Sequence, residues 1–180
     1  MKDYKKEGVI RGELEIDGNL ILTGNLTVEK WVRVTGYIDC AGYSIKAGSS
    51  IEAGYYIEAG SSIEAGYSIK AGGSIKACYS IKAGSSIEAG YSIKAGSSIE
   101  AGTSILAQLW IKSKETISAG IYIYAGLVTW RKREAEDMVI ECSKLLNGEV
   151  SFGTLKETGI EEMENPREIV INGATYVLKG

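Results

Sequence analysis

The chain has 180 residues and a net charge of −3, and it contains no histidine. Lysine and glutamate are interleaved along it, so no segment forms the basic stripe that phosphate contacts require, and direct nucleic-acid binding is not expected. No stretch approaches the length of apolar sequence that a membrane span needs, and the N-terminus has no apolar signal core, so neither a membrane span nor secretion is expected. The cysteines, Cys40, Cys78 and Cys142, are too scattered to indicate a zinc site or a disulfide scaffold, which fits a cytoplasmic location.

A short period organises most of the chain after a charged start. Residues 1–13, MKDYKKEGVIRGE, are expected to form a thin N-terminal cap. Residues 14–40 repeat in units such as LEIDGN and LILTGN, and residues 41–112 form twelve hexads of the type AG-x-x-I-[KE] without an insertion. A fixed period of six is typical of short strands joined by tight bends in stacked coils. The pattern predicts an all-β, single-stranded parallel β-solenoid, similar to left-handed β-helices.

The charges indicate how many hexads make one turn. With three hexads per coil, residue i stacks on residue i+18, and six of the seven Lys/Glu pairs between positions 46 and 100 are then opposite in charge. Only Lys76 and Lys94 are alike. With two hexads per coil, four of eight pairs are like-charged. Opposite charges stabilise a ladder and like charges destabilise it, so we expect a triangular coil of three hexads.

Large and small residues also alternate with this period. Each tyrosine two positions before an isoleucine stacks on a serine or glycine, as in the column Tyr55, Gly73 and Tyr91. Strand alternation predicts that these rings lie inward or at the corners and fill the core. A tyrosine-lined recognition face is the alternative.

The first units and the later hexads differ in phase by one residue. Apolar residues lie two and four positions before the Gly position in residues 14–40, whereas Ile lies three positions before it in the later hexads. A bulge or an altered corner is therefore expected near Cys40–Ile45.

The last part of the chain differs in composition. The solenoid is expected to span residues 14–130, in six to seven coils, because the repeat weakens after Lys112 but keeps its phase. In residues 131–180, apolar residues at helical spacing predict a helix over 131–148, followed by a strand at Val150–Leu155. Glu168–Ile171 and Ala174–Leu178 flank Asn172-Gly173, which predicts a hairpin. This small α+β unit would cap the solenoid or carry a contact surface.

Catalytic chemistry is not expected. The chain lacks histidine, a phosphate-binding glycine loop and a nucleophile motif, and the stacking model pairs the solenoid carboxylates with lysines. Hexapeptide-repeat acyltransferases resemble this chain in period but use a histidine base, and gamma-type carbonic anhydrases bind their metal through several histidines; this chain has no histidine. The hydroxyl rows form a poor ice-binding surface, because charged residues share their face. No cofactor and no metal are expected.

Two resemblances suggest functions. GELEIDGNLILTGNLTV resembles bactofilins, cytoskeletal β-helices that polymerise end to end. The AG-x-x-I-[KE] repeats, with AGLVTW and ECSKLLNGEVSFGTL, are similar to small β-helical proteins of phages and mobile elements, some of which are anti-CRISPR or other anti-defence inhibitors. That resemblance implies a non-enzymatic inhibitor, cytoplasmic in the bacterial host, which sterically blocks a CRISPR effector or another defence nuclease.

The candidate partner contacts lie toward the C-terminal end. They are Trp130, Arg131, Arg133, Glu161, Glu162 and Glu164. The alternative is a bactofilin-like structural protein that assembles through its ends, and a homodimer through one end is a further possibility to be tested.

Overall fold

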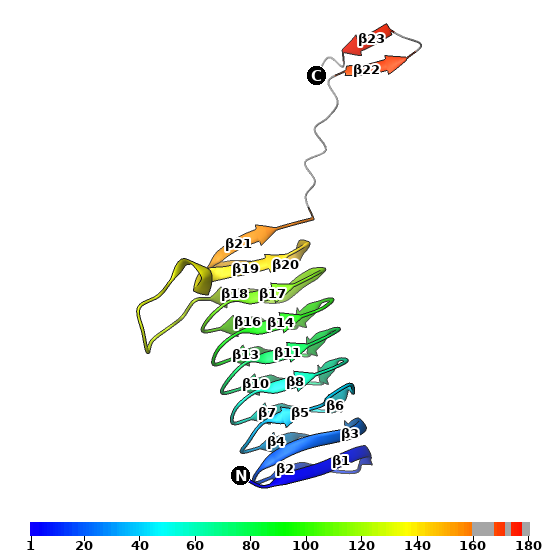
Figure 1. Cartoon of the computed structure of the whole chain (residues 1–180), viewed down its shortest axis with the longest axis vertical. Helices are drawn as coiled ribbons and strands as arrows, with labels where there is room; N and C mark the ends of the chain where they lie inside the picture. The colour runs from blue at the N-terminus through cyan, green and yellow to red at the C-terminus, as the bar shows by residue number, and fades with distance from the viewer. Residues whose placement is uncertain (160–167, 172–173, 178–180) are drawn as a thin grey trace.

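The chain folds into an all-β parallel solenoid with about 18 residues per turn, as the sequence predicts. It has about nine turns, more than the six to seven coils expected from the sequence. The computed structural model describes residues 1–159 and the strands at 168–171 and 174–177, the latter by their backbone alone. Figure 1 shows the coils stacked as a rod, with the N-terminus at one end. Within these residues, no helix is long and apolar enough to cross a membrane.

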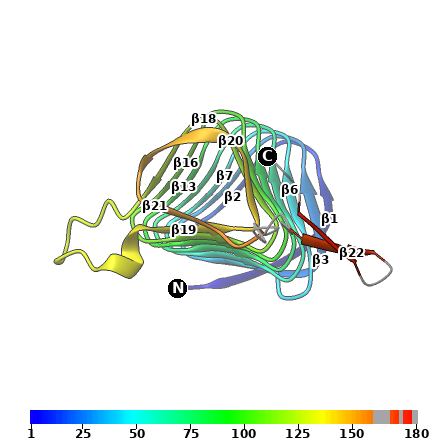
Figure 2. The ribbon, with the colours of Figure 1, turned by 90° about the horizontal axis from the view of Figure 1, so that it is seen from above.

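Stacked strands confirm the predicted coil. Ile45 pairs with Ile63, and Ile63 with Ile81, each three hexads further along the chain. The same offset joins Ile93 to Ile111. Because the members of each pair lie three strands apart in the chain, the coil has three sides (Figure 2).

Each side of the rod is a parallel sheet, which we name after one of its strands. The β11 face contains β5 (Ile38–Asp39), β8 (Ile57–Ala59), β11 (Ile75–Ala77), β14 (Ile93–Ala95), β17 (Ile111–Ser113), β19 (Val139–Cys142) and β21 (Thr154–Glu157). The β12 face contains β6 (Ile45–Ala47), β9 (Ile63–Ala65), β12 (Ile81–Ala83) and β15 (Ile99–Ala101). The β10 face contains β2 (Leu14–Ile16), β4 (Val32–Val34), β7 (Ile51–Ala53), β10 (Ile69–Ala71), β13 (Ile87–Ala89) and β16 (Ser104–Ala107).

Four longer strands turn a corner and contribute to two faces. β1 (Asp3–Ile10) and β3 (Asn19–Val28) pass from the β11 face to the β12 face, whereas β18 (Thr116–Ala125) and β20 (Lys144–Phe152) pass from the β12 face to the β10 face. β1 pairs in parallel with β3, so the predicted cap region is itself a strand of the first coil.

The core is a set of isoleucine columns with alanines beside them. In each three-residue strand of the hexads, Ile and Ala point inward and the charged residue between them points outward, as in Ile75, Lys76 and Ala77. The isoleucines of the hexads are fully buried. Each of them stabilises the fold by roughly 1.5–3 kcal/mol through its removal from water.

One coil is a residue longer than the others, at the predicted place. Leu26 pairs with Ile45 and Ile38 with Ile57, an offset of 19, and the offset returns to 18 between Ile45 and Ile63. The extra residue is accommodated in the corner after Cys40, where Ala41 has a left-handed φ of 44°. The Asp39 carboxylate accepts a hydrogen bond from the Ala41 N–H (2.8 Å). The expected irregularity is confirmed, and an altered corner produces it.

The predicted helix over 131–148 is wrong. Only one 3₁₀ turn forms there, η1 (Ala135–Met138), and β19 begins directly after it. Ile140 stacks on Ile111 in the sheet, and Leu155 stacks on Ile140. The apolar residues at 139–142 fit either period over so short a stretch, and burial against the existing isoleucine column favours the strand.

The end of the solenoid also differs from the expectation. The coils do not stop near residue 130; they resume after an excursion at 126–138 and continue to Glu157 in β21. The expected strand at Val150–Leu155 is divided between β20 and β21, which Gly153 separates. The hairpin is confirmed as the antiparallel pair β22 (Glu168–Ile171) and β23 (Ala174–Val177), whereas its turn and Leu178 lie outside the described residues.

The tyrosines do not fill the core. The five rings at positions 43, 55, 67, 79 and 91 are between 38% and 62% exposed. Their position, two before each Ile, lies at a corner, where the chain bends and strand alternation no longer sets the side-chain direction. Each tyrosine does stack on a serine or glycine of a neighbouring coil, as predicted, but this alternation separates exposed rings along the corners and does not fill the core.

Candidate functional site: an aromatic corner

Departures from the repeat gather at one corner of the rod. The hexads have the form Ala-Gly-[Tyr/Ser]-Ser-Ile-[Lys/Glu], and eight positions depart from it: Tyr56, Gly73, Cys78, Thr103, Leu106, Gln108, Leu109 and Trp110. Tyr56, Gly73 and the three consecutive residues 108–110 lie where the β10 face turns into the β11 face. We call this turn the aromatic corner. Since the plain repeat suffices to build the coil, departures concentrated in one place indicate a role other than folding.

Backbone hydrogen bonds hold this corner in a regular stack. The N–H of Gly73 donates to the carbonyl of Tyr55 (2.6 Å), and the N–H of Tyr91 donates to the carbonyl of Gly73 (3.1 Å). The series continues from Leu109 to Tyr91 (2.8 Å) and from Gly126 to Leu109 (2.9 Å). The side chains at this corner are therefore separated along the rod by the spacing between successive coils.

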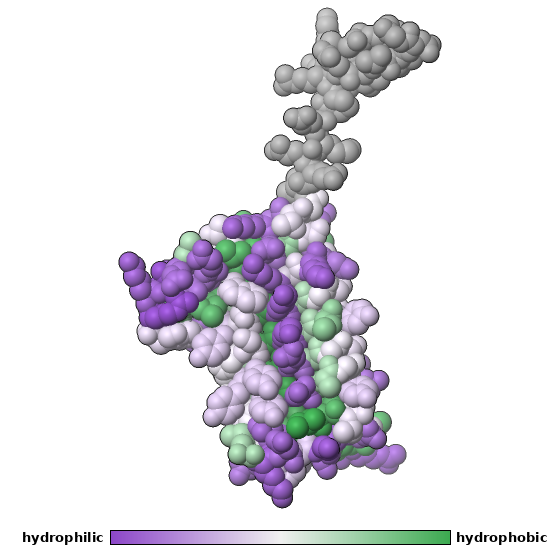
Figure 3. Space-filling model, viewed as in Figure 1, coloured by the Kyte–Doolittle hydropathy of each residue, from purple (hydrophilic) through white to green (hydrophobic). Residues whose placement is uncertain are grey.

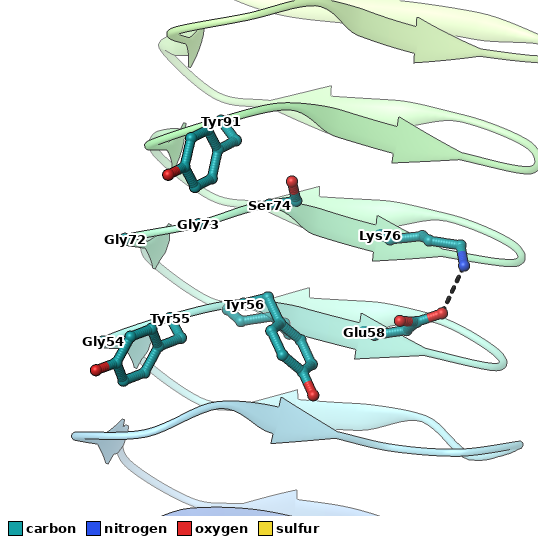
Figure 4. A pocket seen from close by; sticks show the side chains of 10 residues that line it. Gly54, Tyr55, Tyr56, Glu58, Gly72, Gly73, Ser74, Lys76 and Tyr91 are labelled. Atoms are coloured by element: carbon teal, nitrogen blue, oxygen red, sulfur yellow. Dashed lines mark hydrogen bonds and ion pairs between the residues drawn. The ribbon is translucent and has the colours of Figure 1, made fainter. Parts of the chain in front are cut away.

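Gly73 leaves a notch between two exposed tyrosines. Tyr55 lies one coil before it and Tyr91 one coil after it, as Figure 4 shows. The hollow there is about 510 Å³, and its lining includes these three residues together with Tyr56 and Ser74. A volume in this range is typical of sites that bind small molecules.

The neighbouring aromatic rings extend the surface along the rod. Tyr56 stacks on Tyr37, with ring centroids 4.8 Å apart and an interplanar angle of 5°. Burial, followed by the charges of Tyr37, Asp39 and Glu58, raises the pKa of Tyr56. On the other side of the notch, Trp130 meets Tyr91 edge-on at 5.2 Å.

Trp130 belongs to the one long corner excursion in the described part of the solenoid, which projects at the side of the coils in Figure 2. The contacts within this excursion are polar. The Arg131 guanidinium donates to the buried Asp137 carboxylate (2.7 Å), and the other oxygen of Asp137 accepts from the Glu134 N–H (2.8 Å). Arg133 lies over the Phe152 ring at 4.6 Å.

These contacts show which of the predicted partner residues lie at the aromatic corner and which do not. Trp130 is exposed and joins the aromatic corner. Arg131 holds the excursion together, and the Arg133 guanidinium lies against Phe152. Glu161, Glu162 and Glu164 lie outside the described residues.

A charged column runs beside the corner along the β11 face, and Figure 3 shows a hydrophilic stripe over these strands. Lys76 donates to Glu58 one coil away (2.5 Å), and Lys112 donates to Glu141 (2.9 Å). Lys94 stacks between Lys76 and Lys112, in register with both. Within the described residues, Lys94 forms no ion pair with a carboxylate, so it is an uncompensated cation between two lysines that are paired.

Elsewhere the predicted pairing is largely present. Lys46 pairs with Glu64 (2.8 Å), Lys70 with Glu88 (3.3 Å) and Lys82 with Glu100 (2.9 Å). The stack of Lys94 on Lys76, the one like-charged pair predicted from the sequence, is therefore an exception to the pairing seen on the other faces. In residues 1–159 no group of three His, Cys, Asp or Glu side chains is placed to hold a metal ion.

No protein-family model, curated protein or solved structure matches this chain. The fold therefore follows from the chain's own periodicity. Tyr55, Tyr56, Gly73 and Tyr91 are not among the candidate residues predicted from the sequence, because the tyrosines are first expected to fill the core and a tyrosine-lined recognition face is only the alternative. The signal was the departure of Tyr56 and Gly73 from an otherwise strict repeat.

Proposed function

We propose that the chain is a non-enzymatic, rod-shaped binding protein that engages a protein partner through the aromatic corner. The observation that carries this proposal is the notch at Gly73 between the exposed rings of Tyr55 and Tyr91. Exposed aromatic residues on a rigid frame are favourable for binding, because they bury much apolar surface with little loss of side-chain entropy.

Binding is favoured over catalysis by the available side chains. The carboxylates of the hexads stack in columns with lysines and form exposed ion pairs with them, so they supply no isolated acid or base. Burial raises the pKa of Cys40 to about 12 and that of Cys142 to about 11, so neither thiol is a ready nucleophile.

The proposed partner is a host defence protein such as a CRISPR effector, which the solenoid would block sterically inside the bacterial cell. The resemblance of the repeats to small β-helical proteins of phages and mobile elements motivates this choice. A rod of stacked coils suits steric blockade because it changes shape little when it binds.

Photo-crosslinking tests where the partner binds. A photoreactive phenylalanine analogue is placed at position 91 in the aromatic corner or, as a control, at position 79 at a different corner. Both variants are expressed in cells with an active CRISPR system. We expect one cross-linked defence protein from position 91, little from position 79, and a rise in phage plating with the wild-type chain. Equal cross-linking from both positions would contradict the assignment of the corner.

A bactofilin-like structural protein is the second candidate, and the strand ends favour it. β1 pairs on one side with β3, and β21 with β19; within the described residues neither has a partner on its other edge. Open edges of this kind can pair with another copy. Light scattering over a hundredfold concentration range, with electron microscopy of the same samples, tests it. Filaments would favour the structural role, and a constant discrete mass would remove it.

A further inference from the structure

The notch at Gly73 lies at the aromatic corner, and the uncompensated Lys94 lies beside it on the β11 face. Both lie on adjacent coils, since Gly73 precedes β11 and Lys94 is in β14. We propose that together they form a recognition site for an extended segment of the partner, with an aromatic side chain in the notch and a carboxylate on Lys94. This inference rests on the proposed function, because it uses the same corner.

The spacing of the notch suits an inserted ring. Tyr55 and Tyr91 lie two coils apart, a gap of about 9.6 Å at the usual separation of neighbouring strands. Tyr37 and Tyr56, one coil apart, stack with centroids 4.8 Å apart. A ring from a ligand therefore fits between Tyr55 and Tyr91 at about the separation at which this solenoid already stacks two rings.

The charge beside the notch selects an acidic residue. Lys76 and Lys112 each have a carboxylate partner, whereas Lys94 between them has none within the described residues. A second hollow of about 390 Å³ adjoins Lys94, and Lys112 and Lys114 also line it. Glu141 lies there too, and it is already paired with Lys112. An incoming carboxylate would relieve the repulsion along the column, which no intramolecular pair of the described residues does.

The distance between the two features sets the spacing in the partner. Tyr91 and Lys94 belong to the same hexad, so their Cα atoms are at most about 10 Å apart. An extended segment spans this distance when its aromatic and acidic residues are about two to four positions apart.

Two substitutions separate the two contacts, and the repeat supplies matched controls. Gly73→Tyr fills the notch with a residue that the same position holds in other hexads; an added Cβ would lie 3.1 Å from the Tyr55 carbonyl, which requires only a small shift. Ser61→Tyr makes the equivalent change between Tyr43 and Tyr79 at another corner. Lys94→Glu removes the unpaired cation and restores the alternation of charge. Lys82→Glu makes the same charge change on the β12 face, where it also removes the ion pair with Glu100 (2.9 Å).

The experiment pans a displayed library of random heptapeptides against the full-length chain and the four variants. We expect the wild-type chain, Ser61→Tyr and Lys82→Glu to enrich peptides with an aromatic residue and an Asp or Glu at the predicted spacing. Gly73→Tyr should lose the aromatic preference, and Lys94→Glu should lose the acidic preference while keeping the aromatic one. The most enriched peptide should bind each of these two variants roughly two- to tenfold more weakly than the wild type.

The inference is overturned if the wild-type chain enriches no such pattern, or if Gly73→Tyr and Lys94→Glu enrich the same peptides as their controls. Thermal unfolding of each variant shows whether a lost preference reflects a lost fold, and Lys94→Glu should unfold at or above the wild-type temperature. Cross-linking from position 91 tests the proposed function separately. A partner cross-linked there without this peptide preference would leave the proposed function in place and remove only the inference.

Discussion

At the scale of single residues, the solenoid tolerates one strained position. Ala41 is the only residue other than glycine with positive φ in the described part of the chain, and it lies in the corner of the longer coil. A left-handed conformation is unfavourable for alanine because its Cβ approaches the following carbonyl, whereas glycine adopts it freely.

Replacing Ala41 by glycine is expected to stabilise the fold by about 1 kcal/mol through removal of this strain. Urea unfolding followed by circular dichroism measures the change in the free energy of unfolding. Ala47→Gly, in strand β6 with its side chain buried, is the control and should destabilise. A destabilised Ala41→Gly variant would show that the corner does not hold this conformation in solution.

The three thiols differ in reactivity for a similarly local reason. Cys40 and Cys142 are buried and Cys78 is exposed at a corner. Desolvation, which is the larger cause, and the charge of Asp39 raise the pKa of Cys40 to about 12; desolvation and Glu157 do the same for Cys142, to about 11. The thiolate is the reactive form, so burial protects both residues.

Ellman's reagent at pH 8 is expected to modify one thiol per native chain and three in urea. Cys78→Ser should reduce the native count to none. Rapid modification of two or more thiols in the folded chain would contradict the burial of Cys40 and Cys142.

At the scale of elements, the excursion at 126–138 depends on one carboxylate. The hydrogen bond from the Glu134 N–H and, after it, the interaction with Arg131 lower the pKa of Asp137 below its ordinary value of 3.8. A lowered pKa means that the folded excursion favours the ionised form. Its stabilisation is therefore complete above about pH 4 and is lost as the pH falls through the lowered pKa.

The excursion should accordingly loosen in acid before the coils do. With Trp31 and Trp110 replaced by phenylalanine, the fluorescence of Trp130 reports on its packing against Tyr91 during a titration from pH 7 to pH 2. We expect a transition below the ordinary pKa of Asp137, and Asp137→Asn should show the loosened signal already at neutral pH. Glu136→Gln, which changes an exposed carboxylate of the same turn, is the control. An unchanged profile in Asp137→Asn would remove Asp137 from this role.

At the scale of the whole molecule, each coil contacts mainly its two neighbours. The stability of such an array is approximately a sum over coils and their interfaces, so the end coils lack one interface each. β1 is mostly exposed and pairs only with β3 among the described strands, whereas the isoleucines of β8, β11 and β14 lie between coils on both sides.

Hydrogen exchange is therefore expected to be slowest in the middle of the rod and to accelerate toward β1 and β21. Exchange followed by mass spectrometry measures this gradient. Uniform protection along the chain would mean that the solenoid unfolds as a single cooperative unit. Rapid exchange in the centre would contradict the stacking itself.

The sequence by itself determined the repeat architecture. Ile, Ala and the charged residue recur with a fixed period, and the Lys/Glu order is compatible with three hexads per coil and not with two. It also located the extra residue after Cys40, because a change of phase is visible in any periodic pattern. These features depend on interactions between neighbouring coils, which an unbroken repeat encodes directly.

Only the tertiary structure decided the direction of the tyrosines and the course of residues 126–157. A corner side chain points where the bend directs it, and neither strand nor helix periodicity describes a bend. Ile140 joins the column of Ile111 although a long excursion, which hides the repeat, separates the two in the chain. The candidate site depends on the repeat and on the tertiary structure. Stacking of the coils places Gly73 between Tyr55 and Tyr91, and the excursion brings Trp130 against Tyr91.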